Sequence, residues 1–199
     1  MGYLLEHCQL QLLTADLFKS CKPLDCGNAD LNDFFENEAL AYARELLGKT
    51  YVFTTDESPC QMVCAFTISN DSIKVNGMPG SRKKKVIKDV PREKHIRSYP
   101  AVLIGRLGVA EDFKKRGIGK ELMDFIKSWF VDEQNKTGCR FIVVDAYNQA
   151  APLKYYQDNS FEFIFSTEKQ EAEHTGHEPS IPLSTRLMYF DLITLKGED

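Results

Sequence analysis

Residues 109–120 combine residue types that can bind an anion. An apolar run ends at Val109, a basic loop follows, and Gly117 and Gly119 stand where an amphipathic pattern begins. The first amides of a helix lack intrahelical partners and carry about half a positive charge, and glycines let the backbone approach a ligand closely. The cations that flank these glycines are Lys114, Lys115, Arg116 and Lys120. The segment therefore predicts a pyrophosphate site that needs no metal.

Two other phosphate motifs fit this loop less well. A G-x-x-x-x-G-K-[S/T] sequence is absent, and a G-x-G-x-x-G fingerprint would need glycine or alanine in place of Leu122. The alternative interpretation is structural, with the two glycines serving only a tight turn between a strand and a helix. The flanking cations and the preceding apolar run favour the anion site.

The elements that position this loop follow from hydrophobic periodicity. Helices are expected over residues 29–47, between Asn28 as N-cap and Gly48 as the stop, over 117–137 and over 149–159. Strands are expected over residues 4–13, 51–55, 62–69, 100–109, 141–145, 161–165 and 185–192, the second and third forming a hairpin. The alternation of strand and helix from Val102 onward predicts an α/β core with at least one parallel pair.

Composition limits the classes that remain. The 199 residues are 43% hydrophobic, which suits one domain, and the formal net charge is −4. No apolar run approaches the roughly 18 residues that a membrane-spanning helix needs. The first residues lack the basic and apolar regions of a secretory signal. We therefore expect a single cytoplasmic domain over residues 1–199, without a membrane segment.

Six cysteines raise the question of disulfides or zinc. No C-x-x-C pair is present, and His174 and His177 lie in a polar segment without a matching cysteine pair. A chain of this size with a good core does not require disulfides. We therefore expect reduced, mostly buried thiols and no structural metal.

The average charge conceals two stretches of opposite sign. Residues 82–97 carry eight cations against two carboxylates, a net charge of +6, whereas residues 162–178 carry five carboxylates against one lysine, a net charge of −4. The basic stretch is either a solvated loop or a phosphate-contacting surface, and it has no aromatic residue to stack on bases. The acidic stretch could attract a polyamine or a lysine-rich peptide. The candidate RNA contacts are Lys83, Lys84, Lys85 and Arg92.

The segment Lys114-Lys115-Arg116-Gly117-Ile118-Gly119 resembles the cofactor motif of the GCN5-related N-acetyltransferase (GNAT) superfamily, Gln/Arg-x-x-Gly-x-Gly/Ala, with Lys114 in place of the usual Gln or Arg. Residues 148–161 are similar to the second signature of that family, with its Asn, Ala and Tyr. Ser160 replaces the glycine that precedes the closing Phe161, which matters if the turn needs a positive φ. Together the two motifs cover residues 109–161, and their combination is specific.

The resemblance implies an α/β fold in a single GNAT-like domain. It implies a mixed central sheet of about six to seven strands, a parallel pair splayed around an acetyl-CoA cleft, and about four helices. It also implies acetyl-CoA as co-substrate and no metal. The residues expected to bind acetyl-CoA are Leu107, Gly108, Val109, Lys114, Lys115, Arg116, Gly117, Ile118, Gly119, Lys120 and Asn148.

The same resemblance assigns chemical roles. Tyr156 aligns with the family's usual general acid, and a phenol with a pKa near about 10 can give a proton to a departing thiolate. The amide of Val109 is the candidate oxyanion donor, and Gly108 would leave room for the acyl donor. Core packing is the alternative role for Tyr156, and a turn or cap is the alternative for Asn148. No general base is evident.

Residues 24–35 and 99–109 are similar to GNAT toxins of type II toxin–antitoxin pairs, which acetylate the amino group of aminoacyl-tRNA and are neutralised by a ribbon-helix-helix antitoxin. The resemblance implies an acetyl-CoA-dependent N-acetyltransferase with aminoacyl-tRNA as acceptor and such an antitoxin as partner. A small amine, polyamine or protein amine is an alternative acceptor. A non-catalytic acyl-CoA-binding or RNA-binding module is an alternative of another class, and a homodimer is an open option for assembly.

Overall fold

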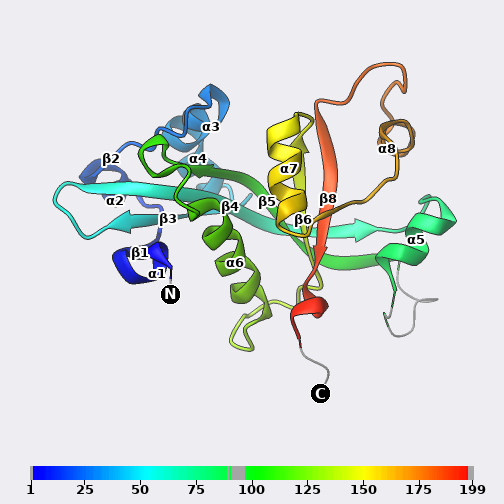
Figure 1. Cartoon of the computed structure of the whole chain (residues 1–199), viewed down its shortest axis with the longest axis horizontal. Helices are drawn as coiled ribbons and strands as arrows, with labels where there is room; N and C mark the ends of the chain where they lie inside the picture. The colour runs from blue at the N-terminus through cyan, green and yellow to red at the C-terminus, as the bar shows by residue number, and fades with distance from the viewer. Residues whose placement is uncertain (1, 89, 91–96, 197–199) are drawn as a thin grey trace. The chain divides into compact units, whose positions relative to one another are not determined.

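The computed structural model describes residues 2–88, 90 and 97–196, in two compact units. Unit 1 comprises residues 1–69 and 104–129, and unit 2 comprises residues 70–103 and 130–199. The long strands β4 (Cys60–Lys74) and β5 (Ser98–Val109) belong to both units along their length (Figure 1).

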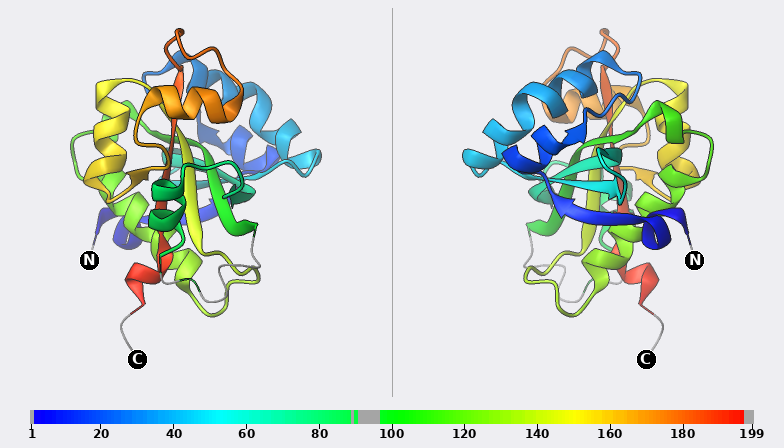
Figure 2. Two further views of the ribbon diagram at one scale, coloured as in Figure 1. Left: turned by 90° about the vertical axis from the view of Figure 1, so that its right-hand side faces the viewer. Right: turned by 90° about the vertical axis from the view of Figure 1, so that its left-hand side faces the viewer.

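The sheet of unit 1 is antiparallel. β1 (Cys8–Leu12) pairs with β3 (Lys49–Thr55), which forms a hairpin with β4 as the sequence predicts. The end of β5 continues this sheet beside β4, where the Ala110 amide donates to the Val63 carbonyl at 2.9 Å. β1 is the edge strand of the order β1-β3-β4-β5 and can be followed in Figure 2.

Helices cover both faces of this sheet (Figure 1). On one face lies α6 (Ile118–Val131), where Phe125 meets Phe53 and Trp129 meets Tyr51 at ring-centroid distances of 5.1 and 4.9 Å. Val52, between these two β3 residues, points to the other face and lines a small apolar pocket. This alternation of side chains along β3 is what separates the two layers.

The second layer differs from the single helix expected over residues 29–47. It consists of α3 (Ala29–Asp33), a π-helical turn η1 (Phe34–Glu38) and α4 (Ala39–Arg44). Asn28 caps α3 as predicted, because its side chain accepts the Leu31 amide at 3.1 Å. The wider π turn contains Phe34 and Phe35, both buried, and Ala39 directly after it is buried as well.

The N-terminal strand expected over residues 4–13 is only half correct. Residues 8–12 form β1, whereas Tyr3–His7 form the short helix α1. The amides of Leu4 and Leu5 donate to the Glu121 carboxylate of α6, at 2.7 and 3.3 Å. A side chain more than 100 positions away thus caps the first turn, which no local pattern could indicate.

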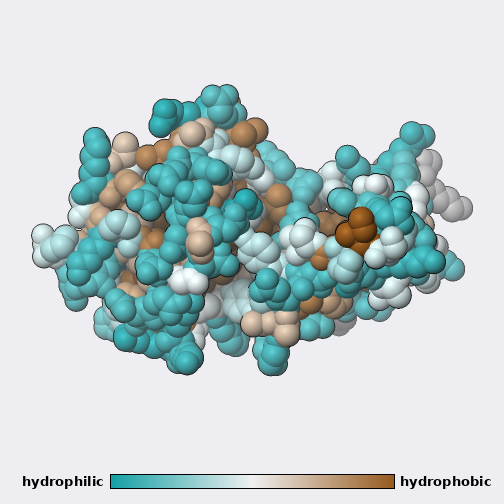
Figure 3. Space-filling model, turned by 90° about the horizontal axis from the view of Figure 1, so that it is seen from above, coloured by the Kyte–Doolittle hydropathy of each residue, from teal (hydrophilic) through white to brown (hydrophobic). Residues whose placement is uncertain are grey.

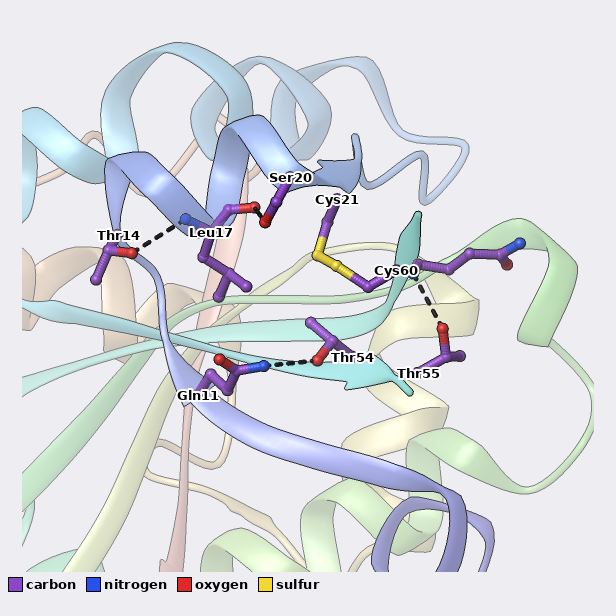
Figure 4. Close-up of a disulfide and its surroundings, with 9 residues drawn as sticks. Gln11, Thr14, Leu17, Ser20, Cys21, Thr54, Thr55 and Cys60 are labelled. Carbon is purple, nitrogen blue, oxygen red and sulfur yellow. Dashed lines mark hydrogen bonds between the residues drawn. A yellow bond between two sulfur atoms is a disulfide. The ribbon is translucent and has the colours of Figure 1, made fainter. Parts of the chain in front are cut away.

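The expectation of reduced thiols is wrong for two cysteines. Cys21 and Cys60 form a disulfide that joins the two-residue strand β2 (Cys21–Lys22) to the start of β4 (Figure 4). β2 follows the capped helix α2 (Ala15–Ser20) and pairs with β4 in parallel, which brings the two α-carbons within 4.6 Å. A two-residue strand has no recognisable sequence pattern, so its pairing with β4 could not be predicted. The disulfide that depends on this pairing could not be predicted either. Cys8, Cys26, Cys64 and Cys139 are free thiols.

Unit 2 is built on the strand order β5-β6-β8-β7, with β5 and β6 parallel and the later pairs antiparallel. Its remaining elements are α5 (Gly80–Val86), β6 (Phe141–Tyr147), α7 (Ala150–Asp158), β7 (Glu162–Phe163), α8 (Glu168–Thr175), β8 (Thr185–Asp191) and the 3-10 turn η4 (Leu192–Leu195). The predicted closing strand over 161–165 shrinks to β7. Val86 and Ile87 from the α5 region pack into a buried cluster with Tyr99, Phe141 and Tyr189.

The predicted fold class is confirmed: the chain is α/β with a mixed sheet containing a parallel pair. Over the described ranges the sheet has eight strands and the chain eight α-helices, more than expected, because short elements such as α1, β2 and α5 carry little periodicity. The single domain over residues 1–199 stays a prediction.

Candidate functional site

The loop between β5 and α6, in unit 1, forms an exposed turn at the start of a long helix. After η3 (Glu111–Phe113), Lys115 and Gly117 adopt left-handed backbone conformations, with φ of 59° and 81°. A Cβ on Gly117 would meet no atom within 4 Å. The side chain of Ile118 is buried in the core and anchors the helix start. Such a turn can present backbone amides to an anion.

The cations around this turn are mostly bound to the protein itself. The Lys114 ammonium donates to the Cys26 carbonyl at 2.7 Å and forms an ion pair with Glu111. Lys120 pairs with Asp124 at 2.7 Å, and Arg116 lies over the Phe113 ring at 5.3 Å. Lys115 is exposed within the turn. The backbone, with Lys115 and Arg116 beside it, is therefore the main candidate to hold a phosphate.

Strand β5 leads into the turn, and its last residues were predicted to line the acyl donor. Leu107 and Val109 are partly buried, and Gly108 is buried. A Cβ on Gly108 would lie 3.2 Å from both Cys26 Sγ and Phe35 Cε2. The packing of the 26–35 segment on β5 thus favours glycine here, and a role of Gly108 toward a ligand stays a prediction.

Tyr156 lies on α7, in unit 2. Its ring packs at 5.1 Å from Tyr155 and at 5.4 Å from Phe161. Burial, with a smaller contribution from Tyr147, raises the pKa of the Tyr156 phenol above its ordinary value. The phenol is therefore protonated throughout the neutral range and can act as a proton donor but not as a base.

Asn148 connects the end of β6 to the segment before β8. Its amide donates to the Ser184 carbonyl at 2.9 Å and its Nδ2 to the Leu183 carbonyl at 2.8 Å. The Leu183 amide donates to the Glu168 carboxylate at 2.5 Å, and this bond, with one from Asn148, lowers the pKa of Glu168. These contacts favour the structural role of Asn148 that the sequence left open.

The basic stretch begins in a helix, because its residues 82–86 belong to α5. In α5, the Arg82 guanidinium donates to the Ile164 carbonyl at 2.8 Å and to the Phe163 carbonyl. Lys85 forms an ion pair with Glu162 at 2.7 Å. Lys83 is partly buried and Lys84 is exposed, while Arg92 lies outside the described residues. Of the predicted RNA contacts in the described part of the stretch, Lys84 and Lys85 are exposed, and Lys85 is paired with Glu162.

The acidic stretch is largely occupied by internal contacts. Glu171 is buried, and it accepts from Arg186 Nε at 2.7 Å and from the Leu187 amide at 2.6 Å. Glu162 forms an ion pair with Lys85, and Glu168 accepts a hydrogen bond from the Leu183 amide. These carboxylates stabilise unit 2, so they do not favour the polyamine-binding or peptide-binding interpretation.

No group of three or more His, Cys, Asp or Glu side chains that could hold a metal occurs within residues 2–88, 90 and 97–196. Over the same ranges, no helix has the length and apolar character needed to cross a membrane. On the face seen in Figure 3, hydrophobic residues lie in small patches separated by hydrophilic ones.

Residues 82–161 match the acetyltransferase (GNAT) family, and this range contains both the 114–119 turn and the 148–161 segment. This range is therefore similar to the GNAT acetyltransferase family. No curated protein matches the sequence at a significant level.

Solved structures extend the likeness beyond the GNAT match to nearly the whole chain. A Tyr-to-Phe mutant of KacT is 16% identical, with a TM-score of 0.68, over 96% of this chain and 98% of that one. AtaTR bound with acetyl-CoA is 17% identical, with a TM-score of 0.66, over 96% and 97%. AtaT complexed with acetyl-methionyl-tRNAfMet is 17% identical, with a TM-score of 0.65, over 95% and 97%. The GNAT fold is thereby confirmed.

Two features of unit 1 are not predicted by the sequence analysis. Asn32 Oδ1 accepts the Cys26 amide at 2.9 Å while Asn32 Nδ2 donates to Asp25 at 2.7 Å, so the turn before α3 is internally bonded. Arg106 of β5 lies with its guanidinium carbon 4.9 Å from the Phe34 ring centroid. The arginine is visible in the strand sequence, but its surroundings depend on the fold.

Proposed function

We propose that the protein transfers the acetyl group of acetyl-CoA to the amino group of aminoacyl-tRNA and acts as the toxin of a toxin–antitoxin pair. The observation that carries the acyl-donor half is the turn at residues 114–119, with left-handed Lys115 and Gly117 directly before α6. The acceptor half is supported by the likeness of nearly the whole chain to AtaT in a structure complexed with acetyl-methionyl-tRNAfMet.

In this proposal, the amides at the start of α6 hold the pyrophosphate, and the Val109 amide donates to the oxyanion that forms on the thioester carbonyl. The free amine attacks the carbonyl carbon, a C–N bond forms and the C–S bond breaks. After the attack, the nitrogen carries a positive charge and loses a proton to water. Tyr156, protonated because burial raises its pKa, gives its proton to the departing CoA thiolate.

The partners follow from the same likeness. AtaT has been crystallised with the C-terminus of the antitoxin AtaR, and KacTA with DNA. We extend this to a ribbon-helix-helix antitoxin for the present protein, in a cytoplasmic setting where charged tRNA and acetyl-CoA are both present. The homodimer remains a prediction.

The experiment is direct. The protein is mixed with acetyl-CoA and a pool of charged tRNA, and the aminoacyl ends are released and analysed by mass spectrometry for N-acetylation. The proposal expects acetylated aminoacyl ends and an equal amount of free CoA. Product on spermidine or lysine peptides with none on tRNA would replace the acceptor. Binding of acetyl-CoA without any transfer would identify a non-catalytic module.

A further inference from the structure

We propose that Arg106 is a phosphate-binding residue of the acceptor site, contacting a backbone phosphate of the acceptor RNA near its aminoacylated end. This inference rests on the proposed function.

The Arg106 guanidinium is held in place but its hydrogen-bonding capacity is not filled. Nη1 donates to the Gly105 carbonyl at 2.9 Å, and the guanidinium carbon lies 4.9 Å from the centre of the Phe34 ring. Nε is buried, and no atom of the described residues accepts a hydrogen bond from it. A guanidinium has five N–H donors, and the Gly105 carbonyl uses one of them, so donors remain for a ligand on this partly buried side chain.

The other arginines that are at least partly buried in the described ranges are bound. Arg140 makes a two-pronged contact with Asp191, at 2.6 and 2.8 Å. Arg186 pairs with Glu171 at 2.7 Å, and Arg82 donates to two backbone carbonyls. Arg106 has no carboxylate partner of this kind among the described residues. Leaving a buried donor unsatisfied costs about 1–3 kcal/mol, which favours a ligand as its missing partner.

The position of Arg106 identifies the acceptor rather than the acyl donor as that ligand. Arg106 and Gly108 are two residues apart on β5 and therefore share a face of the strand. Gly108 faces Cys26 and Phe35, so this is the face covered by α3, η1 and α4. The helix α6, whose start is the candidate pyrophosphate site, covers the opposite face of the unit 1 sheet.

The surroundings of Arg106 are fixed in advance of binding. The Phe34 ring is packed at 5.6 Å from Phe35 and at 5.8 Å from Tyr42. The segment before it is tied to the turn after β5, because Lys114 donates to the Cys26 carbonyl. A guanidinium plane set on an aromatic ring presents its fork of donors in one orientation, which matches the geometry of a phosphate.

The test compares Arg106→Gln and Arg106→Lys with Arg44→Gln, which removes an exposed charge from α4 in the same unit. KM for aminoacyl-tRNA, KM for acetyl-CoA, and the affinity for an RNA hairpin ending in CCA are measured for each. Arg106→Gln should raise KM for aminoacyl-tRNA and weaken hairpin binding about tenfold, with KM for acetyl-CoA within about twofold. Arg106→Lys should recover only part of the loss, and Arg44→Gln should match the wild type.

Thermal unfolding checks that Arg106→Gln is folded, because the variant also loses the Phe34 contact and the hydrogen bond to the Gly105 carbonyl. Unchanged hairpin affinity and tRNA KM in Arg106→Gln would overturn the inference, as would an effect confined to acetyl-CoA. The hairpin assay needs no turnover, so it judges Arg106 even if the wild type acetylates no tRNA, a result that would reject the proposed function instead.

Discussion

The turn before α6 and the basic helix α5 both collect lysines and arginines, yet the two regions use them differently. At the turn, Lys114 and Lys120 are paired locally while the left-handed backbone at Lys115 and Gly117 stays exposed. At α5, Arg82 and Lys85 bind the carbonyls and the carboxylate of the acidic stretch. The glycines of the turn can be interpreted from the adjacent residues alone. The roles of the charges on α5 depend on partners that are far away in the sequence.

The largest effect on stability is expected where the charges are buried. Glu171→Gln should lower the free energy of unfolding by about 3–5 kcal/mol, because it leaves Arg186 as an uncompensated buried charge. The measurement is urea unfolding followed by circular dichroism. Lys120→Met is the matched control: its pair with Asp124 is exposed, and the loss should not exceed about 0.5 kcal/mol. Equal losses of unfolding free energy in the two variants would contradict the expected difference between a buried and an exposed ion pair.

The turn itself is tested by Gly117→Ala. The added methyl group enters the open space in front of α6, and the left-handed φ becomes unfavourable, so KM for acetyl-CoA should rise about tenfold with a loss of about 1 kcal/mol in stability. Gly138→Ala, where a Cβ also meets open space but the backbone is not left-handed, should change neither quantity appreciably. An unchanged KM for acetyl-CoA in Gly117→Ala would show that the turn has only a structural role.

The basic helix is tested by changing its charges in opposite directions. Lys84→Gln should weaken tRNA binding two- to threefold and reduce the slope of log affinity against log salt by about 0.7–0.9, because one phosphate contact is lost. Glu162→Gln should strengthen binding, because it releases Lys85 from its ion pair. Filter binding over a salt series measures both. If neither variant differs from the wild type, α5 is a solvated helix with no RNA contact.

The smallest effect concerns the turn after α7. Ser160 adopts a left-handed φ of 63°, at the position where the family resemblance expects glycine. Ser160→Gly should therefore raise the free energy of unfolding by about 0.5–1 kcal/mol. Ser128→Gly, within α6, should lower it by about 0.5 kcal/mol, since glycine is less favourable than serine inside a helix. Loss of stability in Ser160→Gly would show that the serine side chain makes a compensating contact.

The sequence predicted those parts of the fold that local chemistry determines. The 118–131 helix follows from the spacing of Ile118, Leu122 and Ile126, all buried, and α3 begins at the Asn28 cap. The hairpin of β3 and β4 follows from two strand-like runs around a turn. The turn before α6 could also be predicted, because its glycines are adjacent in the sequence to the residues that begin the helix.

Long-range contacts decided what the sequence could not. α1 exists because Glu121 caps it, and the Cys21–Cys60 bridge exists because β2 lies beside β4. The charges of residues 82–97 and 162–178 were correctly recognised as opposite, but their mutual pairing through Lys85 and Glu162 required the fold. The role of Asn148 toward acetyl-CoA stays a prediction, and its bonds to the 183–184 segment likewise required the fold.

The central claim is that the protein transfers acetyl to aminoacyl-tRNA with Tyr156 as proton donor, and single-turnover transfer tests it most directly. Wild type, Tyr156→Phe and Tyr155→Phe are compared from about pH 7 to pH 9, where the raised pKa keeps the Tyr156 phenol protonated. We expect Tyr156→Phe to slow transfer by about 10²- to 10⁴-fold with unchanged acetyl-CoA affinity, and Tyr155→Phe to resemble the wild type. Transfer by Tyr156→Phe at the wild-type rate would contradict the account.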